Sequence, residues 1–526
     1  MSQPHVQLIN IFHHAFDNFV ATARTCYSGR GIVAVEDVVG PPDLEPSELE
    51  KRRQRKHALA TSLFKAGHHT TLQHAHVQFA LDRVSRHFIW SFLHAHPFYN
   101  SEQVSQRYVT VKEENFHLPD TLAPASAQRY LDCVRARMKD YHTLCELLQP
   151  VVAQAYFARF NGRQGSKRAD TDIRKKAQEA ARYVLPVATH AYLYHTISVI
   201  TLLRYHRVAQ EFDTSAEQRR VTDAMVAALL AHEPEFAVVL EEPLPIEDTP
   251  EYGFFAERGL CEVDTDNARL FTRQFDAELN GAVSILVNHG MNNEGSLADA
   301  VREVLGVTRD SMTDADAIAA VLDPARNRLL GESMNVTTLS KLSRALVHPH
   351  YVFRKKLSHA ADSQDQRHRL TPGSRPILMR HYTGEPDFIT PEIMRESEPA
   401  MELYNAAMAD TYETINQLLH DSETPEDVSY LLPNAVAVRF TEAADLLNQH
   451  HKMAMRLCYN AQEEIWRASL DETRAITAVN PLIGPWLLPP CGLRKHASRK
   501  PICPEGDRYC GVPVWRLAME EYERII

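Results

Sequence analysis

Apolar and polar positions follow two different spacings along the chain, which predict strands and long helices. Val6–Ile11 and His76–Leu81 alternate at every second residue, as half-buried strands do. Residues 126–150 and 172–233 instead carry apolar side chains at helical spacing, and Phe19–Arg24 does so over a shorter length. Strands and long helices in one chain indicate an α+β protein.

Two segments mark boundaries in this pattern. Ser47, with Glu50 three residues later, has the pattern of a capping box and is expected to open a charged helix. The Pro- and Glu-rich stretch 241–250 is typical of a linker. We therefore expect a first domain at 1–245, a second domain at 246–490 and a Cys- and His-containing tail at 491–526.

Landmarks of the first half recur in the second half. Leu185-Pro186 and Leu432-Pro433 are each expected to stand at the start of a long helix. A Gln-Arg pair lies upstream of each, at Gln106-Arg107 and at Gln366-Arg367. This recurrence favours a diverged internal duplication whose period is near half the chain.

Composition narrows the classes of function. A length of 526 residues fits more than one domain, and a hydrophobic content of 44% excludes disorder as the main state. The net charge of −11 argues against nucleic acid as a partner, although it allows a local basic groove. No apolar run is long enough for a membrane helix, and no signal peptide is evident. Scattered cysteines form no disulfide framework, so the cytoplasm is the expected location.

Several arginines have the spacing of an anion site. Arg107 follows Ser105 by two residues, and Arg456 lies in a predicted long helix, so either guanidinium could clamp a phosphate in bidentate fashion. Arg367-His368-Arg369 holds two fixed cations one residue apart, which suits a diphosphate or a reduced-flavin anion. The alternative for each arginine is a surface salt bridge.

The order of these motifs resembles the flavin-dependent thymidylate synthases. In the first half, His69–His74 and Ser105–Tyr108 fit that family, while His94–His96 stands where it has an Arg-His-Arg signature. In the second half, Arg367–Arg369 keeps the signature at the family's spacing from Gln364, but the Ser-x-Arg-Tyr that should follow is absent. A second register, in which 366–368 matches 106–108, stays open.

Further along, the second half resembles the family more closely. Leu432-Pro433, Arg456 and Ala461–Ile465 match a Leu-Pro, an Arg and an Ala-Gln-x-Glu-Ile at the family's spacings. The resemblance implies that this arginine holds the uracil nucleotide. The matching position of the first half is Ala209, so the first half has lost the arginine.

The resemblance also implies a fold and a chemistry. The fold is α+β, with two such domains in tandem, each a small sheet packed with long helices. The chemistry is FAD-mediated one-carbon transfer and reduction on a uracil nucleotide such as dUMP, with methylene-tetrahydrofolate and NADPH as co-substrates. The cofactor then carries the hard chemistry, and no nucleophile is required. The resemblance implies catalytic roles for Arg456 and Ser105. It implies that FAD is bound by Thr70, Arg367, His368 and Arg369. It implies that the nucleotide is bound by Ser105, Gln106, Arg107 and Arg456.

Each half keeps what the other has lost, which suggests composite sites. The family works as a homotetramer whose sites combine several subunits, so two chains of this protein would form a pseudo-tetramer as a homodimer. One alternative is a catalytically inactive nucleotide-binding or scaffolding paralogue. Another is a flavin enzyme with a changed substrate, such as a modified base or an RNA uridine.

The tail offers a separate candidate site. Three thiols and an imidazole lie within 20 residues, and such ligands suit tetrahedral zinc. The alternative is a packed tail with ordinary reduced thiols, because no Cys-x-x-Cys pair is present. The candidate zinc ligands are Cys491, His496, Cys503 and Cys510.

Overall fold

The computed structural model describes residues 3–41, 43–94, 97–210, 212–258, 263–524 and 526. Two separate four-stranded antiparallel sheets are packed with helices, which confirms the predicted α+β class. The first sheet has the order β1 (His5–Ile11), β2 (His76–Ser85), β4 (His190–Ser198) and β3 (Asn100–Gln103). The second has the order β5 (Ser284–His289), β6 (His350–Ser358), β8 (Ala437–Asp445) and β7 (Gly373–Ser374).

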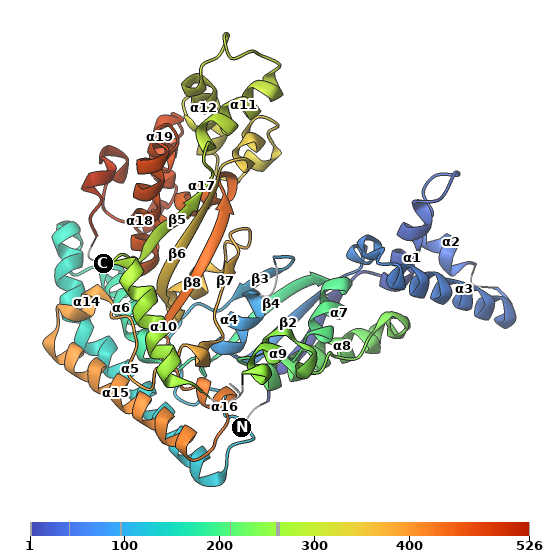
Figure 1. Ribbon diagram of the computed structural model, residues 1–526, viewed down its shortest axis with the longest axis horizontal. Helices are drawn as coiled ribbons and strands as arrows, with labels where there is room; N and C mark the ends of the chain where they lie inside the picture. The colour runs from blue at the N-terminus through green and yellow to red at the C-terminus, as the bar shows by residue number, and fades with distance from the viewer. Residues whose placement is uncertain (1–2, 42, 95–96, 211, 259–262, 525) are drawn as a thin grey trace.

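Helices surround the two sheets, and two helical regions project from the body (Figure 1). The main first-half helices are α1 (Ala15–Thr25), α2 (Val35–Val39), α3 (Pro46–Lys65), α4 (Arg86–His94), α5 (Pro124–Arg159), α6 (Lys167–Ala181), α7 (Val199–Arg207) and α8 (Ser215–His232). The later ones are α9 (Pro250–Glu257), α10 (Thr265–Leu279), α11 (Asn293–Leu305), α12 (Asp314–Leu322), α13 (His359–Asp365), α14 (Glu392–Arg395), α15 (Glu398–His420), α16 (Pro425–Ser429), α17 (Leu446–Arg456), α18 (Glu463–Val479) and α19 (Pro490–His496). Helices α1–α3 form one projection and α11–α12 the other.

The two sheets repeat one topology, and this decides between the two registers. Ser85 at the end of β2 pairs with His190, as Ser358 at the end of β6 pairs with Ala437. A short helix then follows β2 in the first half, α4, and another follows β6 in the second half, α13. The segment 367–369, directly after α13, therefore occupies the position of 94–96 and not that of 106–108. Residues 95 and 96 themselves lie outside the described residues.

Some local predictions are confirmed and others are wrong. The expected strands at 6–11 and 76–81 and the helix at 126–150 are present as β1, β2 and α5. The helix predicted over 172–233 is wrong, because β4 lies between α6 and α7 and shows an alternating burial pattern. The two Leu-Pro pairs accordingly precede strands β4 and β8 rather than helices. The capping box is also wrong, since α3 begins one residue before Ser47, at Pro46.

The two halves contact each other at their Leu-Pro pairs, and the contacts are nearly symmetrical. Val187 donates its N–H to the carbonyl of Leu432, and Asn434 donates to that of Leu185, both at 2.8 Å. An antiparallel bridge links Pro186 to Pro433. Helices α5 and α15 pack together, and their buried side chains belong to one apolar cluster that contains residues of both halves. The junction is thus built from backbone pairing and a shared core.

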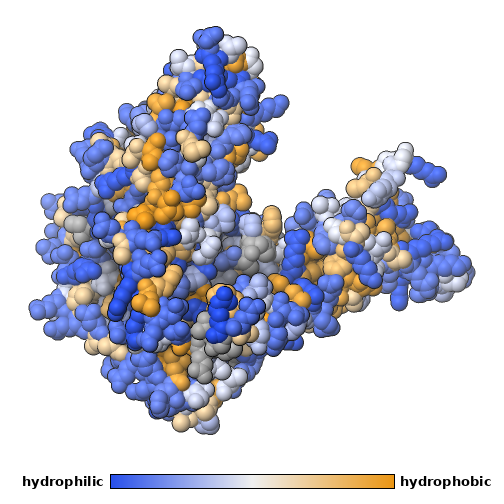
Figure 2. Space-filling model, viewed as in Figure 1, coloured by the Kyte–Doolittle hydropathy of each residue, from blue (hydrophilic) through white to orange (hydrophobic). Residues whose placement is uncertain are grey.

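Hydrophilic and hydrophobic residues are distributed unevenly over the surface. Figure 2 shows hydrophilic residues over most of the two projections, with hydrophobic patches in the central part of this face. Among the described residues, no helix is both long enough and apolar enough to cross a membrane.

Candidate functional site

The loop after β3 brings first-half residues to the junction between the halves. Gln106 is buried, and Gln178 of α6 donates to its carbonyl at 2.9 Å. Asn434, in the second half, donates to its side-chain Oε1 at 3.1 Å. The hydroxyl of Ser105 accepts from the backbone N–H of Arg107 at 3.3 Å, so the loop turns tightly there. These bonds aim the next side chain, Arg107, at the second half.

Arg107 crosses the junction and contacts both halves. Its Nη1 lies 3.5 Å from the Gln364 Oε1, and its Nη2 donates to the carbonyl of Asn460 at 2.9 Å. Its Nε forms an ion pair with Glu179 of α6. Burial opposes ionisation of that carboxyl, yet Arg107 and Lys176 lower the pKa of Glu179 to about 2. Arg107 is therefore a fixed, charged group at a boundary between the halves.

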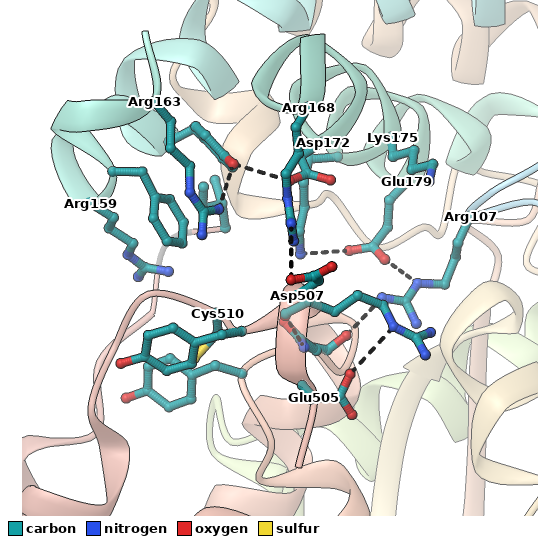
Figure 3. A pocket seen from close by; sticks show the side chains of 18 of the residues that line it. Arg107, Arg159, Arg163, Arg168, Asp172, Lys175, Glu179, Glu505, Asp507 and Cys510 are labelled. Carbon is teal, nitrogen blue, oxygen red and sulfur yellow. Dashed lines mark hydrogen bonds and ion pairs between the residues drawn. The ribbon is translucent and has the colours of Figure 1, made fainter. Parts of the chain in front are cut away.

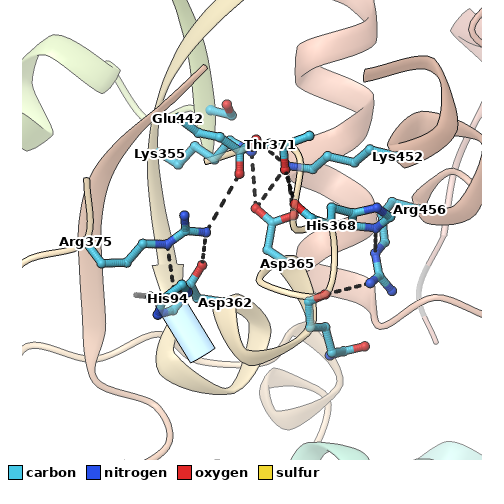
Figure 4. A network of polar contacts seen from close by, with 12 residues as sticks. His94, Lys355, Asp362, Asp365, His368, Thr371, Arg375, Glu442, Lys452 and Arg456 are labelled. Atoms are coloured by element: carbon cyan, nitrogen blue, oxygen red, sulfur yellow. Dashed lines mark hydrogen bonds and ion pairs between the residues drawn. The ribbon is translucent and has the colours of Figure 1, made fainter. Parts of the chain in front are cut away.

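Arg456 reaches the same glutamine from the other side. It ends α17 and donates from Nη2 to the carbonyl of Gln364 at 2.6 Å. Its Nε donates to Nε2 of His368 at 2.8 Å, which requires a neutral imidazole (Figure 4). Burial lowers the pKa of His368 well below its usual value, and the cations Arg456 and Lys452 lower it further. Gln364 thus links Arg107 of the first half to Arg456 of the second.

A third guanidinium, Arg182, was not selected from the sequence as a site residue. It begins the turn before Leu185-Pro186, is buried, and has no hydrogen-bond partner for Nε or Nη2 in the described structure. Burial lowers its pKa, and repulsion from Arg107 adds to this effect. The signal available in the sequence was its place beside the Leu-Pro pair. A buried guanidinium with unused donors has the chemistry to bind an anion.

Arg86 extends this excess of positive charge. It begins α4 and is buried, and its Nε has no partner among the described residues. Burial, followed by repulsion from Arg182 and Arg367, lowers the pKa of Arg86 to about 9. We call Arg107, Arg182 and Arg456, with Arg86 behind them, the arginine cluster.

A buried carboxyl positions the cluster. Glu464 of α18 accepts hydrogen bonds from the backbone and hydroxyl of Ser358 and from the hydroxyl of Tyr183, next to Arg182. Burial raises the pKa of Glu464 to about 7, although these hydrogen bonds oppose the rise. The first half repeats the arrangement, with Glu217 accepting from Ser85 and from Tyr430. Each glutamate therefore ties its own half to the other.

A network of buried charges lies next to Arg456 and His368 (Figure 4). Lys452 of α17 donates to Asp365 at 3.0 Å and also to Glu442. Lys355 of β6 donates to Glu442 at 2.7 Å and to Asp365 at 3.3 Å. These four side chains are at most 1% exposed, so each charge depends on the others for compensation. The network fixes α17 against the end of α13.

The predicted FAD residues are only partly brought together. Arg367 forms an ion pair with Glu102 at 2.6 Å, and Arg369 donates to the carbonyl of Pro97 at 3.3 Å, so this loop docks on the first half. Arg369 also lies over the ring of Tyr99 at 5.2 Å. Thr70 is exposed on a 3₁₀ turn (His69–His74) that packs against α1 and α7. No hydrogen bond or ion pair in the described structure joins that turn to residues 367–369.

The repeated topology defines a second, equivalent position that lacks the cluster. Glu217 of the first half is equivalent to Glu464 of the second. The same difference in residue number makes Ala209 the equivalent of Arg456, and Ser429 the equivalent of Arg182. The guanidinium on that side, Arg375, is neutralised by the buried Asp362 at 2.9 Å. Within the described residues, only one of the two positions keeps the three arginines.

The structure brings together three of the four predicted zinc ligands. Cys491, Cys503 and Cys510 line one small cavity together with Cys458, but His496 lies against the ring of Trp486 instead, with centroids 6.1 Å apart. No group of three or more His, Cys, Asp or Glu side chains in the described residues is arranged to hold a metal ion. Burial raises the pKa of the Cys491 thiol to about 12, which favours the neutral form.

Two α+β halves of the same topology, with an arginine cluster at their junction, define the architecture of this chain. The chain belongs to the thymidylate synthase complementing protein family, whose profile matches residues 7–235 and 286–482. The gap between the matched segments agrees with the structural repeat.

Curated relatives are distant flavin-dependent thymidylate synthases. The chain is 26% identical to that of Nitratidesulfovibrio vulgaris over 230 residues, 43% of this chain and 82% of that protein. It is 26% identical to that of Clostridium tetani, over 36% of this chain and 66% of the relative. It is 27% identical to that of Pyrococcus abyssi, over 28% of this chain and 64% of the relative. The chain therefore spans less than two thirds of the Clostridium tetani and Pyrococcus abyssi proteins. A solved UMP/dUMP methylase, PolB from Streptomyces cacaoi bound with 5-Br dUMP, is 18% identical, with a TM-score of 0.28 and coverage of 45% of this chain and 96% of that one.

Proposed function

We propose that this protein is an FAD-dependent enzyme that transfers a one-carbon unit to a uracil nucleotide such as dUMP and reduces it. Family membership supports the class of reaction. The observation that carries the proposal is the arginine cluster, in which Arg107 of the first half and Arg456 of the second both contact Gln364, and the buried Arg182 is close enough to Arg107 to be repelled by it.

The cluster suits the phosphate of a nucleotide. Arg182 has two unused donors, and a bidentate bond to phosphate oxygens would satisfy them while relieving the repulsion from Arg107. Ser105 and Gln106, on the same loop, would complement the guanidinium groups with neutral polar groups. Arg456 would then lie where it can stabilise negative charge that develops on the uracil ring, with His368 as its hydrogen-bond acceptor.

The residues present fit a diphosphate-bearing cofactor next to this site. Arg367 and Arg369 extend toward the first half, and the buried Arg86 has an unused Nε and is repelled by Arg367. An anion between them would compensate this charge. FAD held there would supply the electron and one-carbon transfer chemistry. Thr70 would take part only if another chain brought it to the site, as the proposed homodimeric pseudo-tetramer allows.

The test is the absorbance spectrum of the purified full chain before and after incubation with FAD and removal of excess. We expect oxidised-flavin bands, followed by NADPH oxidation that dUMP accelerates and that yields a methylated nucleotide when methylene-tetrahydrofolate is added. Arg456→Ala should remove the dUMP effect and keep the flavin bands. A chain that retains no flavin under any condition would exclude the enzymatic proposal.

Loss of one site gives specific support to a second candidate, a nucleotide-binding paralogue without catalysis. Ala209 and Ser429 show that this chain has already lost the cluster on one side. This candidate predicts tight dUMP binding by a colourless protein. A flavoprotein that leaves dUMP unchanged but modifies another uridine would instead indicate a changed substrate.

A further inference from the structure

A second cavity, next to the arginine cluster, combines unpaired cations with aromatic rings. It encloses about 180 Å³ between the ends of α5 and α6 in the first half and residues 505–510 of the tail (Figure 3). We call it the tail pocket. Arg107 lies between it and the cluster, because it lines the pocket and also contacts Gln364.

The wall of the tail pocket has an excess of positive charge. Among the described residues, seven arginines and lysines line it against four carboxylates, in a chain whose net charge is −11. Every carboxylate is already engaged: Glu179 with Arg107, Asp172 and Asp507 with Arg168, and Glu505 with Arg508.

Three cations of the wall remain without a counter-charge. Arg159, Arg163 and Lys175 form no ion pair within the described part of the chain, and Figure 3 shows Arg159 and Arg163 on one side of the pocket and Lys175 on the other. Like charges around one cavity repel one another, and an anion between them would remove that cost.

Two of the cations at the pocket have donors without a hydrogen-bond acceptor. Lys176 of the wall donates no hydrogen bond from Nζ, although Glu179 lies 3.7 Å away. Arg524 is buried with no partner for Nη1 or Nη2 in the described structure, while its Nε donates to the carbonyl of Ile526. Burial lowers the pKa of Lys176 to about 8, although Glu179 opposes this, and repulsion from Arg524 and Arg107 lowers it further. Arg524 and residues 505–510 lie beyond the segments matched by the family, whereas the other six cations of the wall lie within them. The tail therefore closes a pocket whose positive charge comes mainly from the first half.

Aromatic rings flank the cations. Arg163 lies over the ring of Phe160 at 3.9 Å, and Lys175 lies over that of Tyr108 at 5.5 Å. Tyr459 and Tyr509 also line the cavity. Ring faces beside guanidinium groups are typical of sites that stack a planar base while they hold its phosphates.

We propose that the tail pocket binds a second nucleotide, a ligand with two adjacent phosphates next to an aromatic base, such as a nucleoside diphosphate or the equivalent part of a dinucleotide. The inference goes beyond the proposed function and does not require methyl transfer. It assigns to the tail a binding role separate from that of the arginine cluster.

The test is calorimetric titration of the full chain with ADP as the probe, using adenosine and pyrophosphate as partial probes. The double variant Arg159→Gln, Lys175→Gln removes two unpaired cations, and Arg174→Gln, an exposed residue of the same helix α6 outside the pocket, is the matched control. We expect ADP affinity to fall about tenfold or more in the double variant and less than about twofold in the control, with both partial probes weaker than ADP.

Parallel dUMP titrations separate this inference from the proposed function. We expect dUMP affinity to fall in Arg456→Ala and to stay unchanged in the double variant, whose folding is checked by its thermal unfolding. Absence of ADP binding, equal ADP affinity in all chains, or loss of ADP binding in Arg456→Ala alone would overturn the inference. None of these ADP results would change how the dUMP titrations are interpreted.

Discussion

Single buried groups carry the site at the scale of the residue. Arg182 and Arg86 are cations that the fold buries and leaves with unused donors, while Glu464 is a carboxyl whose pKa burial raises to about 7. Such groups persist where function or positioning requires them, since each one costs stability on its own. The unused donors of Arg182 favour an anionic ligand. Glu464 accepts a hydrogen bond from Tyr183, the residue next to Arg182, and so holds that segment in place.

Glu464 gives the first prediction, which concerns the pH dependence of stability. Its pKa is about 7 in the folded chain against 4.5 for the free side chain, so the folded chain binds more protons between these values. The free energy of unfolding should therefore fall by about 3 kcal/mol as pH rises from 4.5 to 7 on account of this group. Urea denaturation at several pH values measures it.

Glu464→Gln is the variant for this measurement. It cannot ionise, so we expect a smaller fall in stability over the same pH range. Some fall should remain, because burial also raises the pKa of Glu426 to about 7. An unchanged fall in the variant would show that Glu464 titrates normally in the folded chain.

Elements decide which residues meet, and sequence patterns reach only part of this scale. The strands at 6–11 and 76–81 were predictable because each keeps one period over its length. Strand β4 was not, because its exposed positions include the tyrosines Tyr192 and Tyr194, so that the segment has no clear alternation of apolar and polar residues in the sequence. Periodicity cannot separate a strand from a helix in such a run. The arginines of the motifs were predictable one by one. Their meeting around Gln364 was not, since it depends on how α13 and α17 pack.

The buried network between α13, α17 and the second sheet leads to a prediction about stability. Lys452→Met leaves Asp365 and Glu442 with Lys355 as the remaining lysine partner, in a fully buried setting. We expect it to lower the free energy of unfolding by about 3–5 kcal/mol. Lys356→Met, which removes a half-exposed ion pair with Asp276, should cost about 1 kcal/mol or less. Equal losses in urea denaturation would contradict the role given to the network.

At the scale of the whole molecule, the two halves share one sheet topology and depend on each other. Their backbones pair at the two Leu-Pro sequences, and α5 and α15 share one apolar core. Of the two equivalent positions at the junction, one keeps three arginines, and the other has Ala209 and Ser429 with a neutralised Arg375. We therefore expect one nucleotide site per chain, built from both halves.

The most direct test of this composite site is calorimetric titration with dUMP of the wild type, Arg182→Ala, Arg456→Ala and the double variant. Arg182 belongs to the first half and Arg456 to the second. We expect one site per wild-type chain, a loss of affinity of about tenfold or more in each single variant, and a double variant that loses less than the product, because both groups serve one ligand. Unchanged affinity in either single variant, or two sites per chain, would contradict a single site shared by the two halves.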